Sequence, residues 1–375
     1  MSKTVILTVG TRPEGIKMIP VYYAFKNAGF NPVICSTAQH RSILDEVFDV
    51  FDVAPDVDLD IMKAGQDLFH INSLVLLKMR DIFKQYKPSL VLVQGDTTTV
   101  MASASAAFYM DIPIGHVEAG LRTNDIRAPF PEEFNRRVAA LVAKYNFAPT
   151  KISAENLLKE NIDPNTIFCT GNTVVDALRI IKDRIETKKI IIDKVVEDVV
   201  ESVKKNGKQL IVLTAHRRES FGGGIERILK AVKNFAESHP NVFFFYPYHP
   251  NPNVLKAIES VDLKSTKNIF MTKPIAYKEM VYLLLNASWV ATDSGGIQEE
   301  AVSLNKHVLV LREKTERPEG ILTGLAHLVG TDSVKIKKMM EKLTSNSYNA
   351  SNNFTNVYGD GYAAEKIVSI CEKKW

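Results

Sequence analysis

The sequence is poor in cysteine, and the few cysteines are widely spaced. Cys35, Cys169 and Cys371 are the full complement, and no two of them have the CxxC spacing. This pattern argues against a disulfide framework and against a structural zinc site. A chain of 375 residues also buries enough apolar surface to fold without such crosslinks. We therefore expect a protein without a metal.

Long hydrophobic runs and blocks of like charge are also missing. No stretch approaches the roughly 18 consecutive apolar residues that a membrane span needs. The apolar run at Thr4–Val9 is too brief for a signal peptide. The 47 basic and 43 acidic residues give a net charge of only +4, and neither sign forms a long block. We therefore expect a cytoplasmic protein that binds neither membranes nor nucleic acid.

What the sequence does contain is a regular alternation of short apolar runs and amphipathic stretches. Runs of about five residues, rich in β-branched side chains, are typical of parallel strands covered by helices on both faces. The alternation predicts an α/β fold with doubly wound sheets. The predicted strands are Thr4–Val9, Pro32–Ser36, Leu90–Gln94, Ile114–Val117, Tyr145–Ala148, Ile167–Thr170, Gln209–Leu213, Val242–Tyr246, Asn268–Met271, Trp289–Ala291 and His307–Leu311.

A charged region of helical pattern, residues 172–208, interrupts this alternation. We therefore expect two Rossmann-like domains, residues 1–172 and 173–360, with a hinge near Asn172. The helical segment 361–373 is expected to pack back on the first domain. Two such domains would face a cleft at the carboxyl ends of their strands, where α/β sheets bind ligands. The turns that follow the strands are thus the places to look for chemistry.

In the first half, one turn carries basic residues and three segments carry acids. Arg12 and Lys17 lie around a predicted helix start, where free amides favour an anion, although a plain turn with two solvated charges has the same pattern. Asp96 follows a strand, and its simplest role is to cap the next helix. For Glu118 the simplest role is a salt bridge to Arg122.

Glu132 stands in the first turn of a predicted helix, where an acid complements the helix dipole. The argument for function is the shared location of these acids. Asp96, Glu118 and Glu132 would all open toward one edge of the sheet, which makes them candidates for proton transfer.

In the second half, the polar residues point to a phosphate. His216 ends a strand and is followed by two arginines, a cationic setting that favours a neighbouring anion. Ser294 and Gly295 open a helix with exposed amides that a diphosphate can approach closely. Glu300 lies within the first turns of that helix, where it can accept hydrogen bonds from sugar hydroxyls, and Arg317 follows downstream. Together these residues indicate a nucleotide-diphosphate site.

Eight motifs, taken in order along the chain, carry a family resemblance. The sequence resembles the non-hydrolysing UDP-N-acetylglucosamine 2-epimerases in GTRPE, TAQHR, GDTTT, HVEAGLRT, FPEE, HRRES, DSGGIQEEA and TERPE. The match runs over essentially the whole chain. It implies the two-domain glycosyltransferase-B fold, no cofactor and a homodimer.

The resemblance also implies a reaction and roles for residues. UDP would be eliminated anti across C1–C2 of UDP-GlcNAc to give 2-acetamidoglucal, then added back to give UDP-ManNAc. Asp96, Glu118 and Glu132 would remove and return the C2 proton, and His216 would assist the departure of UDP. The implied UDP contacts are Arg12, Lys17, Ser294, Gly295, Glu300 and Arg317.

Some bacterial relatives carry a second UDP-GlcNAc as an activator. The positions of this sequence that match that site are Gln39, His40, Gln66, Arg217 and His249. Three rival functions stay open at this point. One is a hydrolysing epimerase that releases ManNAc and UDP, and another is a glycosyltransferase of the same fold. The third is a regulator that binds a UDP-sugar without converting it.

Overall fold

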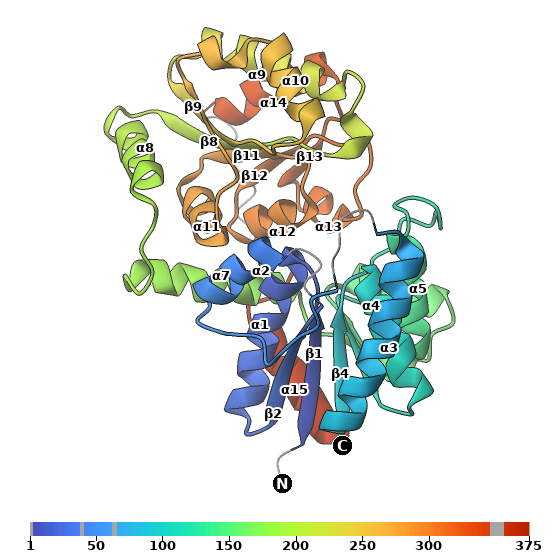
Figure 1. The fold of residues 1–375 in the computed structure, drawn as a ribbon. Coiled ribbons are helices and arrows are strands. Elements are labelled where there is room, and N and C mark those ends of the chain that lie inside the picture. Colours follow the sequence, from blue (N-terminus) through green and yellow to red (C-terminus); the bar gives the residue numbers. More distant parts are fainter. Residues whose placement is uncertain (1–2, 38–40, 62–65, 346–355, 375) are drawn as a thin grey trace. The chain divides into compact units, whose positions relative to one another are not determined.

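The structure is a computed structural model, and it describes residues 3–37, 41–61, 66–345 and 356–374. The chain divides into two compact units: residues 1–180 together with 358–375, and residues 181–357. Each unit is built around its own parallel sheet with helices on its faces (Figure 1). The predicted α/β class with doubly wound sheets is confirmed.

In the first unit, the described residues form a seven-stranded sheet in the order β3-β2-β1-β4-β5-β6-β7, and every recorded pair is parallel. The order reverses between β1 and β4, which are adjacent although β2 and β3 separate them in the chain. The strands are β1 (Thr4–Val9), β2 (Asn31–Ser36), β3 (Val57–Asp58), β4 (Leu90–Gln94), β5 (Ile114–Val117), β6 (Tyr145–Ala148) and β7 (Ile167–Cys169).

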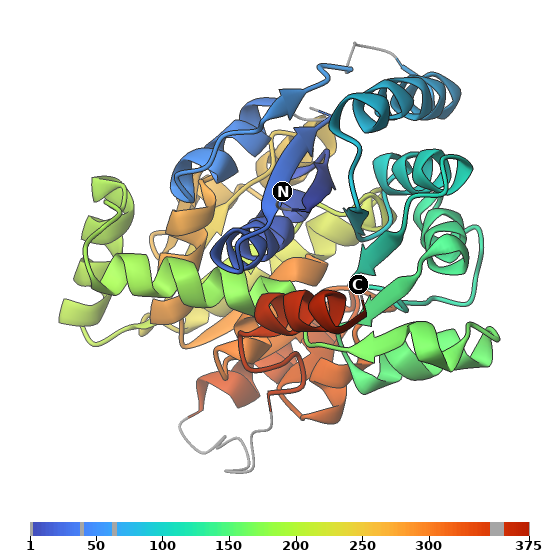
Figure 2. The same ribbon diagram turned by 90° about the horizontal axis from the view of Figure 1, so that it is seen from below.

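Helices connect these strands, and the C-terminal helix returns to this unit, where α15 contacts α1 (Figure 2). The amide of Ala364 in α15 donates to the carboxylate of Asp176 in α7 at 2.8 Å. The helices are α1 (Arg12–Asn27), α2 (Arg41–Val50), α3 (Leu68–Tyr86), α4 (Thr98–Tyr109), α5 (Glu132–Val142), α6 (Lys151–Lys159), α7 (Thr173–Glu186) and α15 (Ala363–Lys374).

In the second unit, the described residues repeat the plan with six parallel strands in the order β10-β9-β8-β11-β12-β13. Here the order reverses between β8 and β11. The elements are β8 (Gln209–Thr214), β9 (Val242–Pro247), β10 (Ile269–Thr272), β11 (Trp289–Thr292), β12 (His307–Val310), β13 (Ala326–Leu328), α8 (Lys194–Lys205), α9 (Gly224–Ser238), α10 (Pro252–Ser260), α11 (Tyr277–Asn286), α12 (Gly295–Ser303), α13 (Pro318–Leu322) and α14 (Ser333–Thr344).

Burial of apolar side chains on both faces of each sheet holds these elements in place. All five residues of β4 are buried, and Val91 and Val93 share one core cluster with Val75 and Met79 of α3. Each such side chain stabilises the fold by roughly 1.5–3 kcal/mol. No helix within the described ranges is both long and apolar enough to cross a membrane.

Candidate functional site

The turn between β1 and α1 is held by a buried acid, Glu14. Its carboxylate accepts hydrogen bonds from the amides of Gly10 and Thr11, both at 2.7 Å, and from the hydroxyl of Thr97 at 2.6 Å. Burial raises the pKa of Glu14 to about 7, although these hydrogen bonds oppose that effect. Gly10 is required here because a Cβ would lie 2.5 Å from Oγ1 of Thr37. The turn that carries Arg12 is therefore rigid.

Glu118 follows β5 in an unusual backbone conformation, with φ at +67°. A glutamate in the left-handed region costs on the order of 1 kcal/mol or more and is typical of functional positions. Its carboxylate forms a nearly buried ion pair with Lys17 of α1 and accepts a hydrogen bond from Gln94 of β4. The expected simple role of Glu118, a salt bridge to Arg122, is wrong.

Arg122 has a different partner. It makes a bidentate pair with Glu160, with Nε and Nη2 at 2.9 and 2.7 Å from the two carboxylate oxygens. That pair fastens the segment after β5 to the end of α6. Glu118 therefore pairs with Lys17, the cation that the sequence analysis suggested as a partner for a bound anion.

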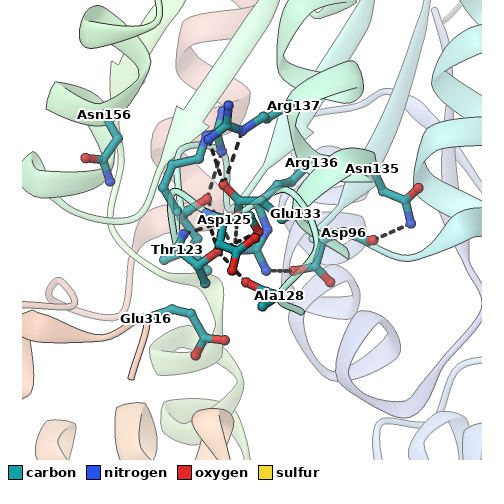
Figure 3. A network of polar contacts seen from close by, with 12 residues as sticks. Asp96, Thr123, Asp125, Ala128, Glu133, Asn135, Arg136, Arg137, Asn156 and Glu316 are labelled. Atoms are coloured by element: carbon teal, nitrogen blue, oxygen red, sulfur yellow. Dashed lines mark hydrogen bonds and ion pairs between the residues drawn. The ribbon is translucent and has the colours of Figure 1, made fainter. Parts of the chain in front are cut away.

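Asp96 lies in the turn between β4 and α4, and it does not cap the helix. The N-cap is Thr97, whose side chain accepts from the amide of Val100 at 3.4 Å, so the expected capping role is wrong. The carboxylate of Asp96 instead pairs with Arg136 of α5 (Figure 3). Asn135 adds a hydrogen bond to the carbonyl oxygen of Asp96 at 2.9 Å. Helix α5 therefore orients Asp96.

Two adjacent acids open α5, and they differ in what surrounds them. Glu133 is fully buried and accepts from Arg136, from Arg137 and from the amide of Thr123, at 3.1–3.2 Å (Figure 3). Its role is therefore structural. Glu132 has an oxygen, Oε2, that is buried and has no hydrogen-bond partner among the described residues. That oxygen can accept a proton or a hydrogen bond from a ligand.

His116, which precedes Glu118 in the HVE motif, forms a hydrogen bond with the backbone. The ring is fully buried, and Nε2 lies 2.7 Å from the carbonyl oxygen of Gly95. Burial lowers the pKa of His116 to about 4, so the ring is neutral, and the contact assigns its proton to Nε2. This hydrogen bond fixes the turn that precedes Asp96.

In the second unit, His216 follows β8 and lies beside Asp293, which follows β11. Oδ2 of Asp293 accepts from the amides of His216 and Arg217, at 2.5 and 2.7 Å. Oδ1 of the same carboxylate lies 3.3 Å from Nδ1 of His216. The imidazole also stacks on His249, with ring centroids 5.6 Å apart. The structure thus brings His216 together with Arg217 and His249.

Arg317 covers the start of α12. A Cβ on Gly295 would lie 2.4 Å from Cζ of Arg317, so only glycine leaves room for that guanidinium. Arg317 pairs with Glu299 at 2.8 Å and with Glu316 at 3.2 Å. Burial opposes ionisation of Glu316, but Arg317 and Arg312 lower its pKa to about 2. The guanidinium is therefore fixed beside the start of α12, where helix amides favour an anion.

Ser294 is the N-cap of α12, although its side chain makes no capping hydrogen bond. Glu300, in the second turn of the helix, is buried. The structure therefore places the predicted residues in two groups. The first unit holds Arg12, Lys17, Asp96, Glu118 and Glu132, and the second holds His216, Arg217, His249, Ser294, Gly295, Glu300 and Arg317.

The residues matched to an activator site are only partly described. Gln39 and His40 lie outside the described residues. The amide group of Gln66 donates to the carbonyl oxygen of Ile61 at 2.8 Å. Across residues 3–37, 41–61, 66–345 and 356–374, no group of three or more His, Cys, Asp or Glu side chains could hold a metal ion.

Sequence reasoning missed two buried acids, Glu14 in the first unit and Asp293 in the second, and each orders a turn of its own unit that carries predicted site residues. Glu14 had a local signal, because Thr11 and Glu14 have the spacing of a capping box, and both of its hydrogen bonds are present. Asp293 had only its place directly after a strand. Its partners, His216 and Arg217, are far away in the sequence.

Comparison with known proteins points to a single family. A protein-family model described as UDP-N-acetylglucosamine 2-epimerase matches residues 24–372. The UDP-N-acetylglucosamine 2-epimerase of Yersinia pestis is 45% identical over 367 residues, which is 97% of each chain.

Solved structures agree with this match over the whole length. The crystal structure of UDP-GlcNAc 2-epimerase from Neisseria meningitidis, bound to UDP-GlcNAc, is 40% identical, with a TM-score of 0.90 over 99% of this chain and 100% of that one. The Methanocaldococcus jannaschii UDP-GlcNAc 2-epimerase, in complex with UDP-GlcNAc and UDP, is 33% identical, with a TM-score of 0.81 over 100% of each chain.

Proposed function

The chain belongs to the UDP-N-acetylglucosamine 2-epimerase family, and on that premise we propose that it interconverts UDP-GlcNAc and UDP-ManNAc. The reaction is a non-hydrolysing one in which UDP leaves by anti elimination and then returns. The observation that carries the proposal is the placement of Asp96, Glu118 and Glu132 on neighbouring elements of one unit. A glycosyltransferase needs no such trio around C2 of the sugar.

The elimination breaks the C2–H bond and the C1–O bond. It needs one group that accepts the proton from C2 and another that stabilises the departing UDP. A carboxylate takes the proton from C2 while the electron pair of the C1–O bond leaves with UDP, which yields 2-acetamidoglucal. Return of UDP to C1 and of a proton to the opposite face of C2 gives the epimer. Water is not consumed, so no free sugar forms. The chemistry needs only a positioned acid–base pair and stabilisation of the leaving diphosphate.

The three carboxylates differ in how they are engaged, and this suggests their roles. Asp96 and Glu118 are each paired with a cation, Arg136 and Lys17 respectively, so they are held in fixed orientations. Oε2 of Glu132 lacks a partner among the described residues. We assign proton removal at C2 to Glu132, with the other two acids stabilising positive charge at C1 and returning the proton.

The second unit supplies groups suited to the diphosphate. Arg317 and the amides at the start of α12 would hold it, Glu300 would bind the ribose, and His216 would assist its departure. Because the positive end of a helix and a guanidinium both favour negative charge, they would stabilise UDP more as it leaves. Arg12 would add a further cation.

Proton NMR of UDP-GlcNAc incubated with the protein in D2O tests the reaction. We expect UDP-ManNAc with deuterium at C2 and no net free UDP. Stoichiometric UDP with free ManNAc would instead establish the hydrolysing reaction. An unchanged spectrum, with both UDP-sugars supplied, would refute epimerase activity.

The acid–base assignment has its own test. We expect Asp96→Asn to lower kcat by roughly 100-fold or more, with the Kd for UDP, measured by calorimetry, left within a few-fold. Asp125, an exposed acid in the loop before α5, provides the matched control Asp125→Asn, which should retain full activity. Equal losses of kcat and of UDP affinity in Asp96→Asn would indicate a structural role instead.

We also propose that the protein is a homodimer. Helices α4 and α5 contact one another, and near their C-terminal ends they expose Phe108, Tyr109 and Leu141. Apolar side chains gathered on neighbouring helices are typical of an interface. Light scattering should give twice the chain mass, and Leu141→Lys should shift the mass toward that of one chain. A wild-type mass equal to one chain would refute the proposal.

A further inference from the structure

Asp293 is a fully buried carboxylate in the turn after β11. It follows β11 directly, and its side chain is 0% exposed. A buried carboxylate is costly unless donors surround it. Among the described residues, the donors to its carboxylate are the amides of His216 and Arg217, in the segment after β8. The carboxylate therefore joins the two turns at the point where the strand order of this unit reverses.

The two oxygens of Asp293 have separate tasks. Oδ2 accepts two backbone amides, those of His216 and Arg217, and so fixes the path of the chain at this turn. Oδ1 is left for the imidazole, 3.3 Å from Nδ1 of His216. On its face the imidazole is backed by the ring of His249 at an interplanar angle of 13°. The ring is thus oriented from two sides.

Oδ1 is buried and forms no hydrogen bond with the described residues, and Nδ1 of His216, 3.3 Å away, is the imidazole nitrogen that faces it. A carboxylate oxygen only accepts hydrogen bonds, so a proton on Nδ1 is the one that can satisfy Oδ1. This leaves Nε2 as the nitrogen that exchanges a proton with a ligand. The side chain of His216 is 35% exposed, whereas Asp293 is sealed from solvent, so the ring has one buried and one accessible side.

We propose that Asp293 is a positioning residue that holds His216 in its orientation and keeps Nδ1 protonated throughout the reaction. The inference deepens the proposed function, because it rests on His216 as the group that assists the departure of UDP. As the C1–O bond breaks, Nε2–H gives its proton to the diphosphate oxygen, and the ring becomes the neutral Nδ1–H form. On return of UDP, the same proton moves back to Nε2.

Asp293→Asn separates this role from a structural one. The amide oxygen of asparagine must take the place of Oδ2, because two backbone N–H groups point there. Its NH2 group then faces Nδ1 and forces that nitrogen to be an acceptor, so the proton moves to Nε2. The variant therefore keeps the turn and reverses the tautomer. A comparable change in a Ser-His-Asp triad costs about 10⁴-fold in kcat.

The experiment is long-range ¹H–¹⁵N NMR of the histidine rings, with His216 assigned by the signals lost in His216→Gln. We expect Nδ1 to carry a proton in the wild-type protein, and we expect Nδ1 to be unprotonated, with the proton on Nε2 alone, in Asp293→Asn. We also expect kcat to fall by roughly 100-fold or more, with the Kd for UDP within about threefold and Tm nearly unchanged. An unchanged tautomer, an unchanged kcat, or a matching loss of UDP affinity would overturn the proposal.

A matched control is available in the same unit. Asp332 also accepts two backbone amides, from Val334 at 2.8 Å and Lys335 at 3.1 Å, at the exposed start of α14. Asp332→Asn should leave kcat and every histidine signal unchanged. The NMR experiment needs no turnover, so it tests the role of Asp293 separately from the proposed epimerase activity. A protein without epimerase activity would refute the proposed function while the tautomer test still gave its answer.

Discussion

Replacing Glu14 with glutamine should change how the stability of the first unit depends on pH. Glu14 is buried, and burial raises its pKa to about 7 from an ordinary value of 4.5. Glutamine has the same shape. Its oxygen can accept the amides of Gly10 and Thr11, and its NH2 can donate to Oγ1 of Thr97, which a hydroxyl can accept. The variant removes the titration and keeps the contacts.

The sign follows from proton linkage. The folded pKa lies above the unfolded one, so the folded protein binds more protons between pH 4.5 and about 7. The stability that the protonated Glu14 side chain contributes is fully present below pH 4.5 and is lost as the pH rises to about 7. The gap between the two pKa values corresponds to about 3 kcal/mol at 1.36 kcal/mol per pH unit. Glu14→Gln lacks this loss.

Both proteins would be unfolded with denaturant at pH 5, 6, 7 and 8. Hydrogen exchange of peptides from β1 and α1 would monitor the unfolding of the region around Glu14. We expect the free energy of unfolding of the wild type, minus that of Glu14→Gln, to fall by about 2.5 kcal/mol between pH 5 and pH 8, since part of the loss has already occurred by pH 5. Glu155→Gln, on the exposed surface of α6, controls for the loss of one carboxylate. A difference that stays flat would refute the reasoning, because the hydrogen bonds would then outweigh burial.

Two further substitutions test the two halves of the site. Gly295→Ala places a Cβ 2.4 Å from Cζ of Arg317 and must displace that guanidinium, so we expect a roughly tenfold weaker UDP Kd by calorimetry with little change in Tm. Lys17→Met removes the cation from a nearly buried pair with Glu118, so we expect a loss of about 3–5 kcal/mol in unfolding free energy by denaturant titration. Unchanged values in these assays would contradict the roles assigned to Arg317 and to the pair.

The strands could be predicted from the sequence because their signal is local. A run such as Leu90–Gln94 is apolar at every position, and the structure begins and ends β4 at the same residues. The strands β3 and β13 were missed because two or three residues carry no usable periodicity. They are strands only because a longer neighbour, β2 or β12, pairs with them.

The sequence also predicts a site at the strand ends, but it does not predict how the charged residues there are paired. Arg122 is four residues from Glu118, yet its partner is Glu160. Asp96 precedes a helix, yet it binds Arg136, which lies forty positions along the chain. Two charged residues that are close in the sequence can form an ion pair, but their spacing does not determine whether they do. The selection comes from the packing of α5 and α6 against the sheet, which no local pattern encodes.

In both units a buried acid aligns the two turns at the point where the strand order reverses. These acids, Glu14 and Asp293, are the two that sequence reasoning missed. Where the strand order reverses, the chain leaves adjacent strands in opposite directions, and the two turns lack a shared connection to align them. Glu14 joins the turns after β1 and β4, and Asp293 joins those after β8 and β11. Each acid accepts two backbone amides with one oxygen and faces a side chain with the other. That oxygen of Glu14 accepts a hydrogen bond from Thr97, and that of Asp293 lies 3.3 Å from Nδ1 of His216. The contact with the Thr97 hydroxyl only aligns the two turns. The contact with the His216 imidazole also determines which ring nitrogen carries a proton. The difference predicts that substitution of Glu14 is felt mainly in stability, and that of Asp293 mainly in kcat.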